Sequence, residues 1–153
     1  MNSFDLTNIA KLKLIYLSRV KAADRLKVTC SRNAFDLLIS VWDRETIEYF
    51  EEFKVRLMNR SNSVLGIIQV SKVGVSGTVT DVRIVMQAAI KSNSSGIIIA
   101  HNYPSGNLNP SESDSKITQK IKGTGNLLDI QLLDHHLITG DGDYNSFEDN
   151  GLI

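Results

Sequence analysis

Residues 96–114 read GIIIAHNYPSGNLNPSESD, and this stretch decides which fold and which site we expect. Its first five residues, 96–100, form a short and wholly apolar run, which is typical of a strand buried on both faces. A loop with two prolines follows at 101–110, and Ser111 then opens a helix with apolar residues at helical spacing. A buried strand that leads through a loop into a helix indicates an α/β sheet.

The chain on either side of this stretch alternates between predicted strands and helices. We expect a helix after Ser31, with Ser31 as its N-cap, followed by two strands that form a hairpin. The strands are expected at 50–59, 64–73 and 96–100 and within 127–138, and the later helices at 81–92 and from 111 to about 123–125. The pattern predicts an α/β fold, a mixed sheet flanked by helices.

The first expected strand has two faces of different character. One face carries Glu51 and Phe53 together with further apolar residues, and the other carries Glu52, Lys54 and Arg56. Because the second face is charged, we expect the first face to lie against the core. A carboxylate on an apolar face is costly unless it has a partner or a task, so Glu51 is the better functional candidate.

The composition fits one globular domain with a full core. The 153 residues are 42% hydrophobic, and 17 basic side chains balance 17 acidic ones, so no global charge signals a nucleic-acid partner. Cys30 has no second cysteine to pair with, so we interpret it as a packing residue in a reducing compartment. The sequence shows neither an apolar run of membrane-spanning length nor a leader, so we expect a cytoplasmic protein.

The charges are unevenly distributed along the chain. Residues 1–33 hold seven Lys and Arg against two Asp and Glu, whereas the remainder holds ten against fifteen. Either this basic segment meets an acidic partner, or its charges face water or the acidic part of the same domain. We divide the chain into a basic N-terminal extension with one helix, 1–50, packed on the domain, and the domain itself, 51–153.

Four polar side chains of the central stretch are expected to converge in one crevice. His101 and Tyr103 lie two positions apart at the end of a buried strand, so an extended chain points both the same way. Ser111 and Asp114 start the next helix, and Asp114 lies on its apolar face. Strand ends of this kind collect ligand sites in α/β sheets. Ser111 and Asp114 also fit a helix-capping box, and the two roles can coexist.

The spacing of these residues resembles the metalloprotease signature of JAB/MPN domains, the JAMM motif. That signature has a distant Glu, then His-x-His, seven residues, Ser, two residues and Asp, and 101–114 matches every spacing. The stretch 51–153 is similar to the RadC-like branch, with supporting segments GVSGTVTD, LLDIQLLDHHLIT and YNSFEDNGLI. The resemblance implies an α/β/α arrangement.

The resemblance also implies a zinc-dependent hydrolase of peptide or isopeptide bonds. By correspondence, His101 and Asp114 are metal ligands, and Ser111 helps to hold the developing oxyanion. The family spacing Glu-x-Phe fits Glu51, which would exchange the proton of the zinc-bound water.

Tyr103 stands where the family has its second metal-binding histidine. A neutral phenol, with a pKa of about 10, is a poor zinc ligand at neutral pH. Three alternatives follow. Tyr103 fills the gap in an empty site and bonds Asp114 or Glu51, the site holds metal weakly with water in place of the imidazole, or His135 or His136 substitutes. In the family's Leu-Asp-His segment, His135 is either an accessory site residue or a structural histidine, and His136 is an exposed or packing residue.

The sequence is compatible with three functions of different classes. The first is a RadC-like zinc metallopeptidase domain with an altered site that has either kept or lost its activity. The second is a non-catalytic module that binds a peptide or protein partner in the same groove. The third is a nucleic-acid-associated role, which rests on the family's DNA-repair label and the basic segment, since no nucleic-acid-binding motif is recognised. No membrane partner is expected.

Overall fold

The computed structural model describes residues 10–73 and 80–153, and within them the strands form one mixed sheet. The strands are β1 (Glu51–Met58), β2 (Val64–Val73), β3 (Gly96–Asn102), β4 (Gln131–Ile138) and β5 (Tyr144–Ser146). Their order is β2-β1-β3-β4-β5, with β3 and β4 parallel and the other neighbours antiparallel. The predicted hairpin is β1 and β2, and the mixed sheet is confirmed.

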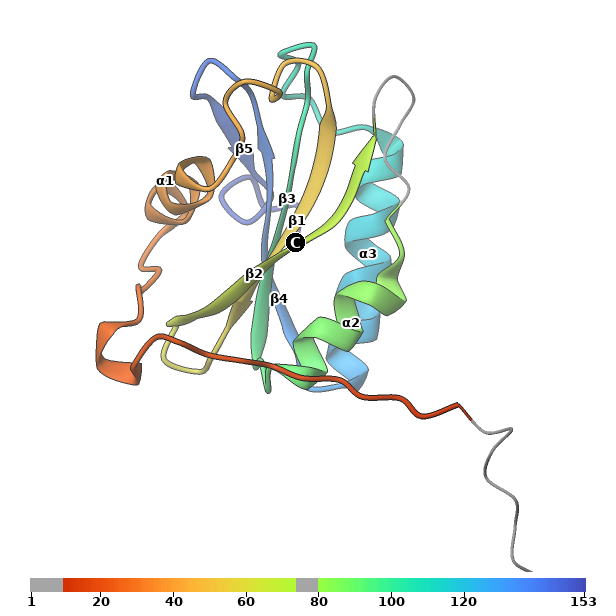
Figure 1. Ribbon diagram of the computed structural model, residues 1–153. Coiled ribbons are helices and arrows are strands. Elements are labelled where there is room, and N and C mark those ends of the chain that lie inside the picture. Colours follow the sequence, from red (N-terminus) through yellow and green to blue (C-terminus); the bar gives the residue numbers. More distant parts are fainter. Residues whose placement is uncertain (1–9, 74–79) are drawn as a thin grey trace, which may run out of the picture.

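Helices cover both faces of this sheet (Figure 1). On one face lies α1 (Ser31–Ser40), whose Phe35 and Leu38 pack with Ala100 of β3 in one core cluster. On the other face lie α2 (Val82–Lys91) and α3 (Glu112–Leu127), which enclose the larger core cluster with β1 and β3. The α/β/α arrangement implied by the resemblance is therefore the fold of the chain.

The charged face of β1 is buried, contrary to the expectation from its sequence. Glu52 is 2% exposed, Lys54 8% and Arg56 0%, because α1 and the following segment with Trp42 cover this side. Charges on a strand indicate exposure only when no other element packs there. The Glu52 carboxylate is balanced by Lys72, 3.4 Å away, and Lys54, 3.9 Å away.

The start of α1 differs from the prediction in its capping residue. Cys30 is the N-cap, and its Sγ accepts a hydrogen bond from the Asn33 backbone N–H at 3.5 Å. The Ser31 hydroxyl instead donates to Asp149 near the C-terminus. Both expectations, a Ser31 cap and a packed Cys30, are wrong, since Cys30 is exposed and caps the helix.

The end of α3 also lies beyond its predicted position. The helix continues through Gly123 and Gly125 to Leu127. A Cβ on Gly125 would lie 2.2 Å from the carbonyl oxygen of Ile130, so this glycine permits close contact between α3 and the chain entering β4. Gly125 therefore does not end the helix, and its missing side chain makes room for this contact.

The strand β3 extends into the region predicted as a loop, because Asn102 anchors its end. The Asn102 amide donates to the carbonyl oxygens of Ile47 and Phe50 at 2.6 and 2.7 Å and accepts from the Glu52 N–H at 2.8 Å. His101 consequently belongs to the strand rather than to the loop. Because Asn102 anchors the end of β3, the strand sets the direction of the His101 side chain.

The N-terminal segment runs past the start of β2. The Tyr16 hydroxyl donates to the Leu65 carbonyl at 2.6 Å, and the Val64 N–H donates to the Leu26 carbonyl at 2.8 Å. Most of the GVSGTVTD segment falls in 74–79, outside the described residues. In the described part of the chain, no helix has the length and apolar character needed to cross a bilayer.

Candidate functional site

A cavity of about 510 Å³ lies between the end of β3 and the first turns of α3. Five residues singled out from the sequence line it: Glu51, His101, Tyr103, Ser111 and Asp114. Its other lining residues are Phe53, Thr80, Ser113, Lys116, Ile117 and Lys120. The structure thus brings the predicted residues together, although they come from three separate elements.

Strand pairing explains why Glu51 reaches this cavity. Phe53 of β1 pairs with His101 of β3, so both side chains lie on the sheet face that carries α3. Glu51 is two residues before Phe53 and shares its face, whereas Glu52 lies on the opposite face with its lysines. The choice of Glu51 over Glu52 agrees with this geometry, although Glu52 is buried rather than solvent-facing.

Asp114 is the centre of the site because its two carboxylate oxygens bind different partners. His101 Nε2 lies 3.1 Å from Oδ1. The Tyr103 hydroxyl donates to Oδ2, which also accepts the Ser111 N–H at 2.7 Å. Burial alone would raise the pKa of Asp114, but the contacts with His101, Tyr103 and Ser111 outweigh it and hold the pKa below its usual range. Asp114 is therefore an anion at neutral pH.

Tyr103 is a neutral hydrogen-bond donor in this arrangement. Burial, reinforced by the adjacent Asp114 carboxylate, raises the pKa of Tyr103 to about 12. The contact with Asp114 is the one required by the first of the three alternatives for Tyr103. The His101 and Tyr103 rings meet edge to face, with centroids 5.0 Å apart.

Ser111 and Asp114 also form the predicted capping box. The Ser111 hydroxyl accepts the Asp114 N–H at 3.1 Å, and the Asp114 carboxylate accepts the Ser111 N–H. Capping and site formation therefore use the same two residues. The cap fixes the direction of the Asp114 side chain toward β3.

His135 supports His101 from inside the protein. It is fully buried, and its Nε2 lies 3.0 Å from His101 Nδ1. Its Nδ1 lies 2.7 Å from the Thr118 hydroxyl oxygen. Burial, and next the electrostatic interaction with His101, keep the pKa of His135 well below the usual value. His135 is thus in contact with the site but does not line the cavity.

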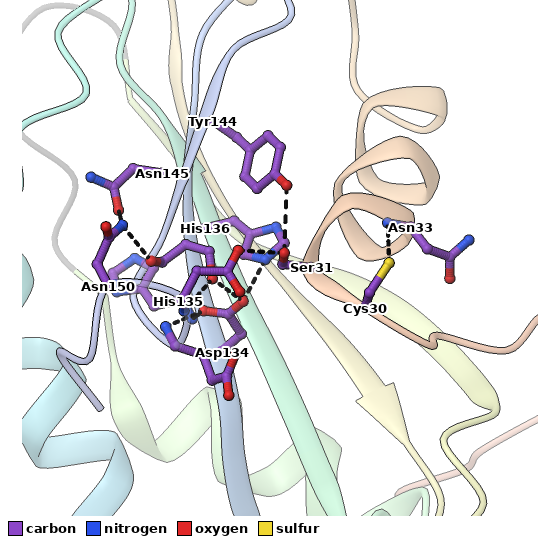
Figure 2. Close-up of polar contacts among 12 residues, drawn as sticks. Cys30, Ser31, Asn33, Asp134, His135, His136, Tyr144, Asn145 and Asn150 are labelled. Atoms are coloured by element: carbon purple, nitrogen blue, oxygen red, sulfur yellow. Dashed lines mark hydrogen bonds and ion pairs between the residues drawn. The ribbon is translucent and has the colours of Figure 1, made fainter.

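His136 points to the other face of the sheet and has no part in the cavity. Its Nε2 contacts Asp134 Oδ2 at 2.7 Å, and the ring lies near Tyr144 of β5, as Figure 2 shows. Asp134 also accepts the Ser146 hydroxyl at 2.6 Å and the Glu148 N–H at 3.0 Å. His136 is a packing residue, and Asp134 holds the C-terminal turn against β4.

The donor set does not fit a catalytic zinc ion. Such sites use three protein ligands and leave one position for water. Here His101 and Asp114 supply two, and the third position holds a neutral phenol that is bonded to Asp114. Within residues 10–73 and 80–153, no group of three or more His, Cys, Asp or Glu side chains is arranged to hold a metal ion.

Sequence reasoning missed Thr118, which joins His135 to α3. Its side chain is completely buried and donates to the Asp114 carbonyl at 2.6 Å. A signal existed, because Thr118 follows Asp114 by four residues and so shares its helix face. The lysines at 116 and 120, on the same helix, were also not anticipated as lining residues.

Comparison with known proteins places this geometry in a family. The profile of the family described as "RadC-like JAB domain" matches residues 28–152. A UPF0758 protein of Flavobacterium johnsoniae is 42% identical over 138 residues, which are 88% of this chain and 58% of that protein. A UPF0758 protein of Moorella thermoacetica is 35% identical over 149 residues, covering 97% of this chain and 65% of that protein.

Another relative, a UPF0758 protein of Porphyromonas gingivalis, is 44% identical over 103 residues, which are 67% of this chain and 45% of that protein. The chain spans about half to two thirds of the length of these relatives, so it corresponds to one part of them. The matched profile includes α1 as well as the sheet, and the chain belongs to the RadC-like JAB domain family.

Proposed function

We propose that this chain is a RadC-like JAB domain that binds a peptide without hydrolysing it, in a pocket derived from a metallopeptidase site. The observation that carries the proposal is the Tyr103–Asp114 bond. A residue that donates a hydrogen to Asp114 competes directly with any cation for the same oxygen. Losing one of three metal ligands should lower the affinity more than the roughly 10- to 100-fold typical of losing a supporting residue.

The lining of the cavity supports a peptide as the ligand. Phe53 and Ile117 provide apolar contacts, and Ser113, Lys116 and Lys120 provide hydrogen-bond donors. Apolar walls with a few polar groups are typical of binding pockets. The two lysines of α3 favour a peptide that carries a carboxylate. Ser113 and both lysines are exposed, so a peptide can approach from the α3 side.

A second candidate, a zinc-dependent peptidase of low metal affinity, is favoured by one observation. Glu51, His101, Ser111 and Asp114 all line one cavity, and they are the residues of the family's signature that this chain keeps, the second histidine being replaced by Tyr103. In that case zinc would be held by His101 and Asp114 and would supply a hydroxide. The two candidates differ in metal content and in the fate of the peptide.

Selection from a phage-displayed library of random peptides tests the binding proposal. Selected peptides should bind the parent protein and should be recovered uncut after incubation with zinc. The substitution Ser113→Trp places a large ring at the cavity mouth and should weaken binding at least tenfold, about 1.4 kcal/mol.

The matched control for this experiment is Gln119→Trp. Gln119 is an exposed residue of the same helix and does not line the cavity, so binding should stay at the parent level. Peptides that bind Ser113→Trp as well as the parent would place the binding surface elsewhere. Zinc-dependent cleavage of the selected peptides would favour the peptidase candidate.

A further inference from the structure

We infer that residues 10–21 form an arm that joins two copies of this chain, by adding as a strand to the free edge of β2 in the other copy. The inference is independent of the peptide-binding proposal and of the cavity beside α3. The arm precedes the part of the chain that matches the RadC-like profile, which begins at residue 28. It belongs to no helix or strand of its own chain.

The arm has a strongly exposed apolar surface. Leu12 is 82% exposed and Leu17 is 76% exposed. Further exposed apolar side chains in the arm are Leu14, Ile15 and Val20. Apolar surface gathered in this way typically marks an interaction site in a soluble protein. Residues 11–14 alternate between lysine and leucine, which is the pattern of a strand with one apolar face.

The arm touches its own domain in its middle and then leaves it. The Tyr16 hydroxyl donates to the Leu65 carbonyl, which places this residue beside the start of β2. Among the described residues, no backbone group pairs with the backbone of 10–20. Figure 1 shows the arm running across the lower end of the sheet and projecting beyond it. The backbone donors and acceptors of 10–15 are therefore available to another chain.

The strand β2 offers an edge on which such a segment can pair. It is the last strand in the order β2-β1-β3-β4-β5, so only its β1 side is paired. Between two irregularities of the pairing with β1, residues 66–69 keep a regular register. Beyond Val64, whose N–H bonds to Leu26, no residue of β2 has a backbone partner outside the sheet in the described part of the chain. An unpaired edge is a template for a strand of another chain.

A second copy of the chain is the partner that fits both surfaces. The arm carries four basic and no acidic side chains, whereas residues 34–153 carry ten basic and fifteen acidic ones. The arm of one copy is therefore attracted to the domain of the other. Each copy contributes an arm and an edge, about 20 residues a side, which reaches the lower end of a standard stable interface. An unrelated peptide would leave one of the two surfaces uncovered.

Sedimentation of the full chain over a range of concentrations tests the inference, together with hydrogen–deuterium exchange. Interfaces of this class bind with micromolar affinity or tighter, so a dimer is expected at roughly 100 µM. Backbone amides within 66–69 should become more protected as the dimer fraction rises. A monomer at that concentration would overturn the inference, since another molecule must then cover the arm. A dimer without added protection at 66–69 would also overturn it.

Matched substitutions locate the interface. Leu12 and Leu127 are 82% and 87% exposed, so a charge at either position leaves the core intact. Leu12→Glu should raise the dimer dissociation constant at least about tenfold, whereas Leu127→Glu, at the end of α3, should leave it at the parent level. Equal weakening by the two variants would contradict the role of the arm.

A proline in the arm tests whether its backbone pairs as a strand. Leu14→Pro removes a backbone N–H outside the folded domain, so it should prevent the dimer and abolish the protection at 66–69. Circular dichroism confirms that the variant is folded. A Leu14→Pro dimer as stable as the parent dimer would show that the arm does not add to the sheet.

Discussion

The Tyr103 hydroxyl donates to one carboxylate oxygen of Asp114 while the N-cap backbone of α3 donates to the same oxygen. In the JAMM motif that the sequence resembles, the residue at the position of Asp114 is a metal ligand. The phenol therefore converts a pair of potential metal ligands into an internal hydrogen-bond network. The contacts with the network hold the pKa of Asp114 below its usual range, so Asp114 accepts these hydrogen bonds as an anion.

Removing the Tyr103 hydroxyl should destabilise the domain. Tyr103→Phe leaves the ring in place but deprives a buried carboxylate of one donor, so we expect a loss of about 1–2 kcal/mol in the free energy of unfolding. Urea unfolding measures this loss. Tyr49→Phe is the control, because Tyr49 is 71% exposed and should give a negligible change. Equal stability of the two variants would mean that the Tyr103 contact contributes nothing.

Stability should fall toward acidic pH in two ranges. The folded state holds the pKa of His135 well below its usual value, so below about pH 6.5 the unfolded chain takes up a proton that the folded chain excludes. Although burial would raise the pKa of Asp134, its contacts with His136 and Ser146 lower it, so a second loss begins below about pH 4. Denaturation midpoints measured from pH 3 to 8 report both losses.

Single substitutions separate these two ranges. His135→Gln should reduce the slope of stability with pH near 6, and Asp134→Asn should reduce it near 4. Asp141→Asn, in an exposed turn, is the control. An unchanged slope in His135→Gln would show that this histidine does not stay neutral in the folded protein.

The buried Arg56 side chain is predicted to lower the free energy of unfolding. Its side chain is completely buried, and none of its three guanidinium nitrogens has a hydrogen-bond partner among the described residues. Burial lowers the pKa of Arg56 to about 10, which reflects the cost of desolvating its charge. Arg56→Met should therefore raise the free energy of unfolding by about 1–3 kcal/mol, as measured in urea.

A surface arginine provides the control for this measurement. Arg60→Met, at an exposed position, should change stability by less than about 0.5 kcal/mol. Marked destabilisation by Arg56→Met would show that the guanidinium has a stabilising role in the folded protein.

Two glycines of α3 should respond oppositely to alanine. Gly125→Ala forces a Cβ to within 2.2 Å of the Ile130 carbonyl oxygen, so we expect a loss of at least about 2 kcal/mol. Gly123→Ala meets no atom within 4 Å and should gain about 0.5–1 kcal/mol from helix propensity. Thermal unfolding of the pair checks this, and a stabilising Gly125→Ala would contradict the close contact.

Sequence patterns predicted the strands and helices around the site well, but they did not predict which other elements pack against them. The apolar run before His101 indicated a doubly buried strand, and β3 is buried along its whole length. The alternation in β1 put Glu51 and Phe53 on the correct face. It could not show that α1 covers the opposite face, because the burial of Lys54 and Arg56 depends on a distant segment.

The same limit applies to the site. The spacing of His101, Ser111 and Asp114 predicted their convergence, since a strand end and a helix start meet there. The sequence did not single out Thr118, because a threonine inside a helix is common. Its contact with His135 arises only because β4 lies beside α3. Cys30 was misinterpreted because the cap of a helix depends on local backbone geometry rather than on hydrophobicity.

Zinc content of the purified full chain, measured after equilibrium dialysis against zinc, tests the central claim most directly. The account predicts far less than one zinc per chain in the parent and a gain of at least tenfold in affinity in Tyr103→His, because an imidazole restores the third ligand. One zinc per parent chain that is lost on His101→Ala would contradict it.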